Sequence, residues 1–182
     1  TGRNPQNAAV AATTGILDLL SKKELEGVIA HELSHVKNRD ILISTIAGTI
    51  AGVISYLSTM AQWAAIFGGF GRDGDGDSNI ISLLVMIILA PLVAVILQSA
   101  ISRSREYLAD KGGAEMLHSG EGLASALEKI EAGVRRKPMR MGNTGTAHLF
   151  IQNPFSGRNM MQLFSTHPST ASRVQKLRRM KW

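Results

Sequence analysis

The sequence predicts a mainly helical protein with a small β element, an α+β fold in which a pair of long apolar helices interrupts a polar helical body. Three features support this prediction: two long stretches without charge, a charged helix that begins at a capping box, and a segment of small residues near the start. The 182 residues are enough for one domain with a sizeable core. The chain contains no cysteine, which excludes disulfides and thiolate metal ligands.

The first elements expected are short. Residues 7–14 (NAAVAATT) are small and compatible with a strand, and a second short apolar piece follows at 16–20. Ser21 then begins SKKE, a capping box in which the Glu24 side chain can reach back to the N-cap amide. This box predicts a helix to about Asn38, with an apolar stripe formed by Leu25, Val28, Ile29 and Leu33.

Two stretches are long enough to cross a membrane. No charge occurs at the 31 positions between Asp40 and Arg72, or at the 25 positions between Asp77 and Arg103. A bilayer crossing needs about 20 mostly apolar residues. We therefore expect a transmembrane hairpin over 41–101 with a loop at about 68–79; the alternative is a buried helical hairpin of a soluble protein.

Charge predicts the orientation of this hairpin. Its outer ends carry four basic residues, whereas the connecting loop carries one arginine and three aspartates. By the positive-inside rule, the ends face the cytoplasm and the loop faces away. The four flanking residues are Lys37, Arg39, Arg103 and Arg105.

The remaining elements follow from local pattern. A helix is expected from Ser102 to Leu117, and another in EGLASALEKIEAG, where Leu123, Leu127 and Ile130 have helical spacing. The later predictions are a loop at 133–147, a short strand in HLFI, and a basic helix with Pro168 in its first turn that ends near Met180.

The sequence HELSH lies in the middle of the capped helix. Residues i and i+4 share a face, so His31 and His35 can bind one ion, and Glu32 lies close enough to act on a metal-bound water. Imidazole ligands with an open position suit a catalytic zinc, and a neighbouring carboxylate suits a general base. The alternative is two surface histidines and a solvated glutamate.

A third ligand is available in SRSREYLAD. Glu106 and Asp110 are four residues apart on an expected helix, so both can face one way. Glu106 would bind the metal, and Asp110 would accept a hydrogen bond from a ligating histidine. Two crossings of the membrane would return Glu106 to the side of His31. The alternative is a solvated helix face with arginine neighbours.

These motifs resemble the HtpX-type membrane metalloproteases, which are gluzincin relatives of the CAAX prenyl proteases. The resemblance rests on HELSH, a membrane hairpin, SRSREYLAD, STHPSTASR and the opening TGRNPQNAAVAATTGIL. It implies a zincin-like peptidase domain formed by 1–40 and 102–182, with the hairpin 41–101 inserted and further membrane helices upstream. It also implies one zinc ion held by His31, His35 and Glu106, with Glu32 as the base.

The same resemblance implies further roles. His167, in STHPST, would stabilise the oxyanion or cap the zinc, although it can also be an ordinary residue before a helix-starting proline. Arg173 could lie near it, but a surface cation is the favoured interpretation. Asn7 and Ala8 would belong to an edge strand that pairs with extended substrate, although Asn7 could simply close a turn.

The leading functional prediction is a zinc endopeptidase at the cytoplasmic face of a bacterial inner membrane, cutting damaged or misfolded proteins in extended conformation during stress. The alternatives are a prenyl-peptide processing protease and a non-catalytic scaffold with a structural metal. Residues 103–182 carry 14 Lys/Arg against 6 Asp/Glu. We expect this basic surface to contact anionic lipid rather than nucleic acid.

Overall fold

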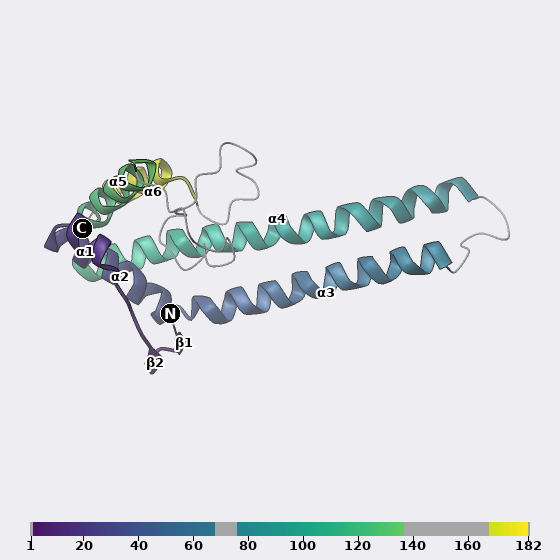
Figure 1. The fold of residues 1–182 in the computed structure, drawn as a ribbon, viewed down its shortest axis with the longest axis horizontal. Helices are drawn as coiled ribbons and strands as arrows, with labels where there is room; N and C mark the ends of the chain where they lie inside the picture. Colours follow the sequence, from purple (N-terminus) through teal and green to yellow (C-terminus); the bar gives the residue numbers. More distant parts are fainter. Residues whose placement is uncertain (1, 68–75, 137–167, 182) are drawn as a thin grey trace.

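The computed structural model describes residues 2–67, 76–136 and 168–181, and shows a long helical hairpin with a cluster of shorter helices at one end (Figure 1). We call this cluster, with the part of the hairpin that packs against it, the helical head. The N- and C-termini lie at the same end (Figure 1). The elements are β1 (Gly2–Asn4), β2 (Asn7–Ala8), α1 (Thr14–Leu19), α2 (Lys22–Lys37), α3 (Asp40–Phe67), α4 (Gly76–Leu117), α5 (Glu121–Arg136) and α6 (Thr170–Arg179).

The hairpin consists of α3 and α4, which run side by side away from the helical head (Figure 1). Two segments, Asp40–Ala64 and Ile87–Leu117, are long and apolar enough to cross a membrane. Only 6% and 11% of their most apolar windows are buried. This exposure argues against the core helices of a soluble fold, and it agrees with the predicted hairpin.

The second arm differs from the prediction in two ways. Residues 76–79 of the loop expected at about 68–79 are helical, because α4 already begins at Gly76, and residues 68–75 lie outside the described part. The helix expected separately from Ser102 is the continuation of the same helix, and Pro91 lies inside it without ending it. The stretch QSAISRSREY contains no glycine or proline, so nothing there interrupts the helix on its way into the head.

The N-terminal segment is the main error of the sequence prediction. The strand expected over 7–14 is reduced to Asn7–Ala8, which pairs antiparallel with Gly2–Asn4, and Thr14–Leu19 is helical. Thr13 caps this helix, since its side chain accepts a hydrogen bond from the Ile16 amide. The local cap therefore outweighs the strand propensity of the threonines.

The other short predictions fall partly outside the described residues. Residue 136 still belongs to α5, so the loop expected from 133 cannot start before 137, and HLFI lies in the undescribed range. Pro168 precedes the final helix instead of lying in its first turn. Ser169 is the N-cap, and its hydroxyl accepts from the Ser172 amide at 3.3 Å.

The start of α2 is as predicted. The Glu24 carboxylate accepts hydrogen bonds of 2.8 Å from both the backbone amide and the hydroxyl of Ser21. It also accepts from Ser125 at 2.6 Å and Lys129 at 2.7 Å, both on α5. The Lys129 ammonium, followed by the Ser125 hydroxyl, lowers the pKa of Glu24 from 4.5 to about 2. One buried side chain thus both caps α2 and fastens it to α5.

Glu24→Gln should lower the free energy of unfolding at pH 7 by about 1–3 kcal/mol, because it removes a charged acceptor shared by several donors. The carboxylate stabilises the fold fully above pH 4.5, and this stabilisation is lost as the pH falls towards 2. The melting temperatures of the native protein and Glu24→Gln should therefore differ less at pH 3 than at pH 7. Glu26→Gln, on an exposed position of α2, is the control and should leave the melting temperature unchanged at both pH values.

The core of the head lies between α2, α5 and α6. Its buried residues are Leu20, Val28, Ala114, Leu123, Ala124, Ala126, Leu127, Ile130, Val174 and Leu177. They include all three residues of the stripe predicted for α5. This core holds α2 from one side while α4 packs on another.

Glycines allow α4 to lie directly against α2. A Cβ added at Gly113 would lie 2.8 Å from the backbone nitrogen of His31, and one at Gly112 would overlap the Ser34 hydroxyl. The contact at Gly113 is with the backbone of α2, which could move only with the whole helix, whereas the Ser34 hydroxyl met at Gly112 could rotate away. Gly113 in particular therefore permits the close approach of the two helices that carry the predicted ligands.

Gly113→Ala should destabilise the fold by about 1–3 kcal/mol through overpacking and should weaken metal binding, since α2 must move away from α4. The matched control is Gly15→Ala on α1, where an added Cβ meets nothing within 4 Å. That control should be neutral or slightly stabilising, because alanine is the better helix former. Equal melting temperatures for Gly113→Ala and the native protein would contradict the argument from close packing.

Candidate metal centre

Two histidines of α2 face each other at the end of the helical head nearest the hairpin. Their rings meet edge to face with centroids 4.6 Å apart, and the Nε2 atoms of His31 and His35 are 3.1 Å apart. His31 is fully buried, whereas His35 is partly exposed. The four-residue spacing on one helical turn thus gives the geometry expected from HELSH.

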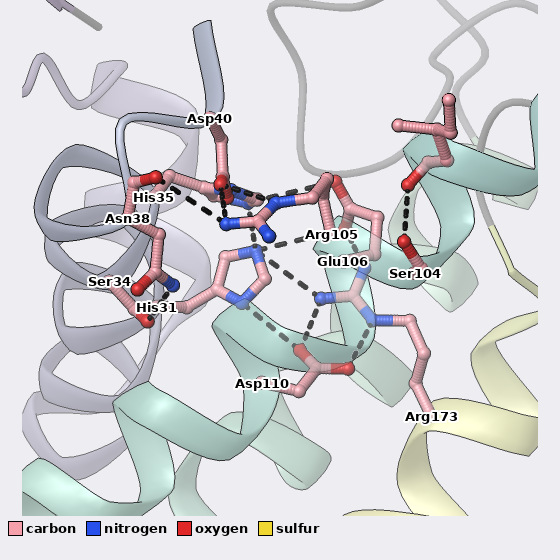
Figure 2. A network of polar contacts seen from close by, with 11 residues as sticks. His31, Ser34, His35, Asn38, Asp40, Ser104, Arg105, Glu106, Asp110 and Arg173 are labelled. Carbon is pink, nitrogen blue, oxygen red and sulfur yellow. Dashed lines mark hydrogen bonds and ion pairs between the residues drawn. The ribbon is translucent and has the colours of Figure 1, made fainter. Parts of the chain in front are cut away.

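Glu106 of α4 completes the group (Figure 2). Its Oε2 lies 3.8 Å from Nε2 of His31, and its Oε1 lies 3.6 Å from Nε2 of His35. One ligand atom from each of the three residues can be chosen so that all lie within 4.8 Å of one another. The structure therefore brings together the two histidines and the glutamate that the sequence indicated, from helices on either side of the hairpin.

These three side chains fit a zinc ion. In a tetrahedral site with metal–ligand bonds of about 2.0–2.2 Å, ligand atoms lie about 3.3–3.6 Å apart, close to the separations of 3.1–3.8 Å found here. Imidazole and carboxylate are ligands that zinc accepts. The site thus has suitable spacing and suitable donors for one divalent ion.

The protonation pattern of His31 also suits a ligand. Nη2 of Arg173 lies 3.4 Å from Nε2 of His31, and a guanidinium can only donate, so Nε2 must accept. The proton of a neutral ring is then on Nδ1, which lies 3.0 Å from Oδ1 of Asp110. This contact lies within ion-pair distance but lacks hydrogen-bond angles, so Asp110 is beside His31 in the place where a carboxylate could orient the ring.

The prediction that Arg173 is a surface cation is wrong. Its side chain is 2% exposed, and the guanidinium forms two hydrogen bonds with Asp110, of 2.8 and 2.6 Å. Its Nη1 also lies 3.0 Å from Oε2 of Glu106. Burial alone would lower the pKa of Arg173, but the adjacent carboxylates of Asp110 and Glu106 outweigh burial and raise it.

The buried position of Arg173 has a weak sequence signal. The residue directly precedes Val174 and lies one helical turn before Leu177, and both of these belong to the core. An arginine on the apolar side of a helix is a candidate for a buried ion pair. Its partner Asp110 lies 63 positions away, so nothing local identifies the pair.

A second aspartate was missed altogether. Oδ2 of Asp40 lies 2.6 Å from Nδ1 of His35, and Oδ1 accepts a 2.6 Å hydrogen bond from Nε of Arg105 (Figure 2). Burial would lower the pKa of His35, but the hydrogen bond to Asp40 and the charge of Glu106 raise it. The surrounding carboxylates thus favour a cation at this position.

The other predicted residues are placed as follows. Glu32 is half-buried on α2, and its charge contributes to raising the pKa of both His35 and Arg173. Asn7 and Ala8 are exposed in β2. The amide and side chain of Asn7 donate to the Asn4 side chain at 2.9 and 2.8 Å, which closes the turn. A substrate-binding role for β2 stays a prediction, and His167 lies outside the described residues.

Several basic residues of the C-terminal helix are engaged within the protein. Arg178 pairs with Glu121 and Glu128 of α5, and Lys176 lies 3.4 Å from the centre of the Tyr107 ring. With Arg173 buried, part of the positive charge of α6 serves intramolecular contacts. The excess of basic residues in this half is therefore a weaker indication of a lipid-binding or nucleic-acid-binding face than the count implied.

A family model described as peptidase family M48 matches residues 1–181. The chain belongs to this family. Among its curated relatives are proteins named protease HtpX homolog from Syntrophotalea carbinolica (58% identical over 180 residues), Thermococcus kodakarensis (55% over 179) and Aquifex aeolicus (54% over 181). The matches cover 99%, 98% and 97% of this chain but 64%, 62% and 60% of these relatives. No solved structure matches the chain.

Membership of the M48 family confirms the resemblance drawn from HELSH and SRSREYLAD. The chain spans a little under two thirds of the length of the relatives named above. The family of metallopeptidases implies a metal ion, and the His31, His35 and Glu106 group is a place for it among the described residues.

Proposed function

We propose that this chain contains the catalytic centre of a membrane-embedded zinc endopeptidase. The observation that supports it most is the cluster of His31, His35 and Glu106 in a member of the M48 family, with donor atoms at the spacing of a zinc site. In this proposal, 1–40 and 102–182 form one peptidase body on the cytoplasmic side of a bacterial inner membrane. The hairpin 41–101 anchors that body in the bilayer.

Each residue then has a role. His31, His35 and Glu106 hold the zinc ion, which when bound supplies Lewis-acid activation of water and of the scissile carbonyl. Glu32 takes a proton from the attacking water and returns it to the leaving amine nitrogen. Asp110 keeps the Nδ1 proton of His31 in place, so that Nε2 stays available to the metal.

The substrates in this proposal are damaged or misfolded proteins, including membrane proteins, bound in extended conformation. β2 offers the edge opposite β1 to such a chain, with Asn7 and Ala8 exposed. Backbone pairing at an edge tolerates many side chains, which suits quality control. His167 would donate to the developing oxyanion or cap the zinc.

The test is proteolysis of unfolded casein by the full-length protein in detergent. Cleavage should require one zinc ion per chain, stop after chelation and resume when zinc is restored. A farnesylated CAAX peptide is offered in parallel. Exclusive cleavage of that peptide would favour a prenyl-processing enzyme, and tightly bound zinc without any cleavage would favour a structural metal.

A further inference from the structure

Nδ1 of each histidine at the metal group faces an aspartate, and the carboxylate of each aspartate contacts an arginine. For His31 these are Asp110 and Arg173, from α4 and α6. For His35 they are Asp40 and Arg105, which stand where the two arms of the hairpin reach the head. The second arrangement lies at a different place in the fold from the first.

The carboxylate of Asp40 is held at both oxygens. Oδ2 lies 2.6 Å from Nδ1 of His35, while Nε of Arg105 donates to Oδ1 at 2.6 Å and Nη2 contacts the same oxygen. Asp40 is 6% exposed. A side chain held in this way has little freedom to turn, so it can fix the ring that it contacts.

The turn between α2 and α3 brings Asp40 to this position. On a continuous helix, a residue five positions after His35 would lie about 140° around the axis and could not reach its ring. The helix instead ends at Lys37, Asn38 is its C-cap, and Arg39 has a φ of 54°, in the left-handed region that residues with a side chain rarely adopt. Arg105 also donates to the Asn38 carbonyl at 3.5 Å, which supports the same turn.

We infer that Asp40 is a positioning residue for the metal ligand His35 and that Arg105 holds it in place. This inference rests on the proposed zinc site. A carboxylate on Nδ1 fixes both the tautomer and the ring direction, so that Nε2 points at the metal. Because Asp40 is the first residue of α3 and Arg105 belongs to α4, the base of the membrane hairpin orients one of the metal ligands.

A simpler role for Asp40 is purely structural. An acidic residue in the first turn favours a helix, and an ion pair between α3 and α4 would hold the arms together. If Asp40 had only that role, a variant that still folds would bind the metal as tightly as the native protein does. The two roles are therefore separated by measuring folding and metal binding on the same variants.

The experiment is competition between the full-length protein in detergent and a chelator of known affinity, with Zn²⁺ and with Co²⁺. The variants are Asp40→Ala and Asp40→Asn, with Asp110→Ala as the positive control and Asp18→Ala, an exposed carboxylate of α1, as the negative control. We expect Asp40→Ala to weaken metal binding about 10–100-fold and to change the visible spectrum of bound Co²⁺. Asp40→Asn should recover part of the affinity, because its amide oxygen still accepts from Nδ1.

Unchanged affinity in Asp40→Ala, with a Co²⁺ spectrum like that of the native protein, would overturn the inference while leaving the zinc site intact. Failure of both Asp40 variants to unfold cooperatively without metal would also overturn it, since Asp40 would then determine the fold. Absence of metal binding by the native protein would refute the proposed function itself. Weakened binding in variants that melt like the native metal-free protein supports the inference.

Discussion

Glu32→Gln should retain zinc and lose peptide hydrolysis by about 10²–10⁴-fold, which is the usual contribution of a general base. Glutamine keeps the size of glutamate but cannot accept the proton of the attacking water. Glu32 is a neighbour of the ligand group and not a member of it, so metal affinity should stay nearly unchanged. The measurement is casein cleavage at saturating zinc, with the zinc content of each sample determined in parallel.

Two further variants make this result specific. His35→Ala removes one of the three ligand residues, so both metal and activity should be lost. Glu26→Gln makes the same chemical change on an exposed position of the same helix and should have no effect on either. Full activity of Glu32→Gln, with no cleavage by a chelated sample, would refute the assignment of the base while keeping the metal requirement.

The sequence predicted the structure correctly where residues on the same helix determine the geometry. The capping box at Ser21 set the start of α2, and four-residue spacing placed His31 and His35 on one turn. The spacing of Leu123, Leu127 and Ile130 likewise predicted the buried face of α5. In these cases, neighbours on the same helix fix the geometry, so a short window of sequence contains the necessary information.

The sequence did not predict the structure where the geometry depends on contacts with distant segments or on an unusual backbone conformation. Asp40 reaches His35 only because Arg39 adopts a left-handed conformation, which no residue type at that position signals. Arg173 is buried because Asp110 and Glu106 on another helix provide its partners. The small and β-branched residues at 7–14 indicated a strand, but only Asn7–Ala8 is one, and the cap at Thr13 starts a helix at Thr14.

The site depends on close contact between helices that belong to different parts of the chain. α2 contributes two ligands, and α4 contributes the third together with the aspartate that faces His31. Gly113 allows their backbones to approach, while Asp40 and Arg105 join both to the start of α3. A hairpin inserted between the two halves of a metal site is therefore compatible with a precise site, because its two arms return to the same point.

The buried arginine of α6 should matter most for stability. Arg173→Met removes the guanidinium while keeping much of the side-chain volume, and it leaves the carboxylates of Asp110 and Glu106 close together with less compensation. Breaking a buried ion pair in this way costs about 3–5 kcal/mol. We expect a loss of this size in the free energy of unfolding of the metal-free protein.

Zinc and a second arginine test the cause of that loss. Added zinc should recover part of the stability, because a cation near Glu106 compensates one of the two carboxylates that Arg173 pairs with, whereas Asp110 gains no such partner. Arg178→Met is the matched control on the same helix; its pairs with Glu121 and Glu128 are solvent-exposed, so its effect should be much smaller. Equal losses for the two arginine variants would show that Arg173 acts through general charge on α6. A large loss confined to Arg173, partly reversed by zinc, would tie the stability of the head to the carboxylates of the metal group.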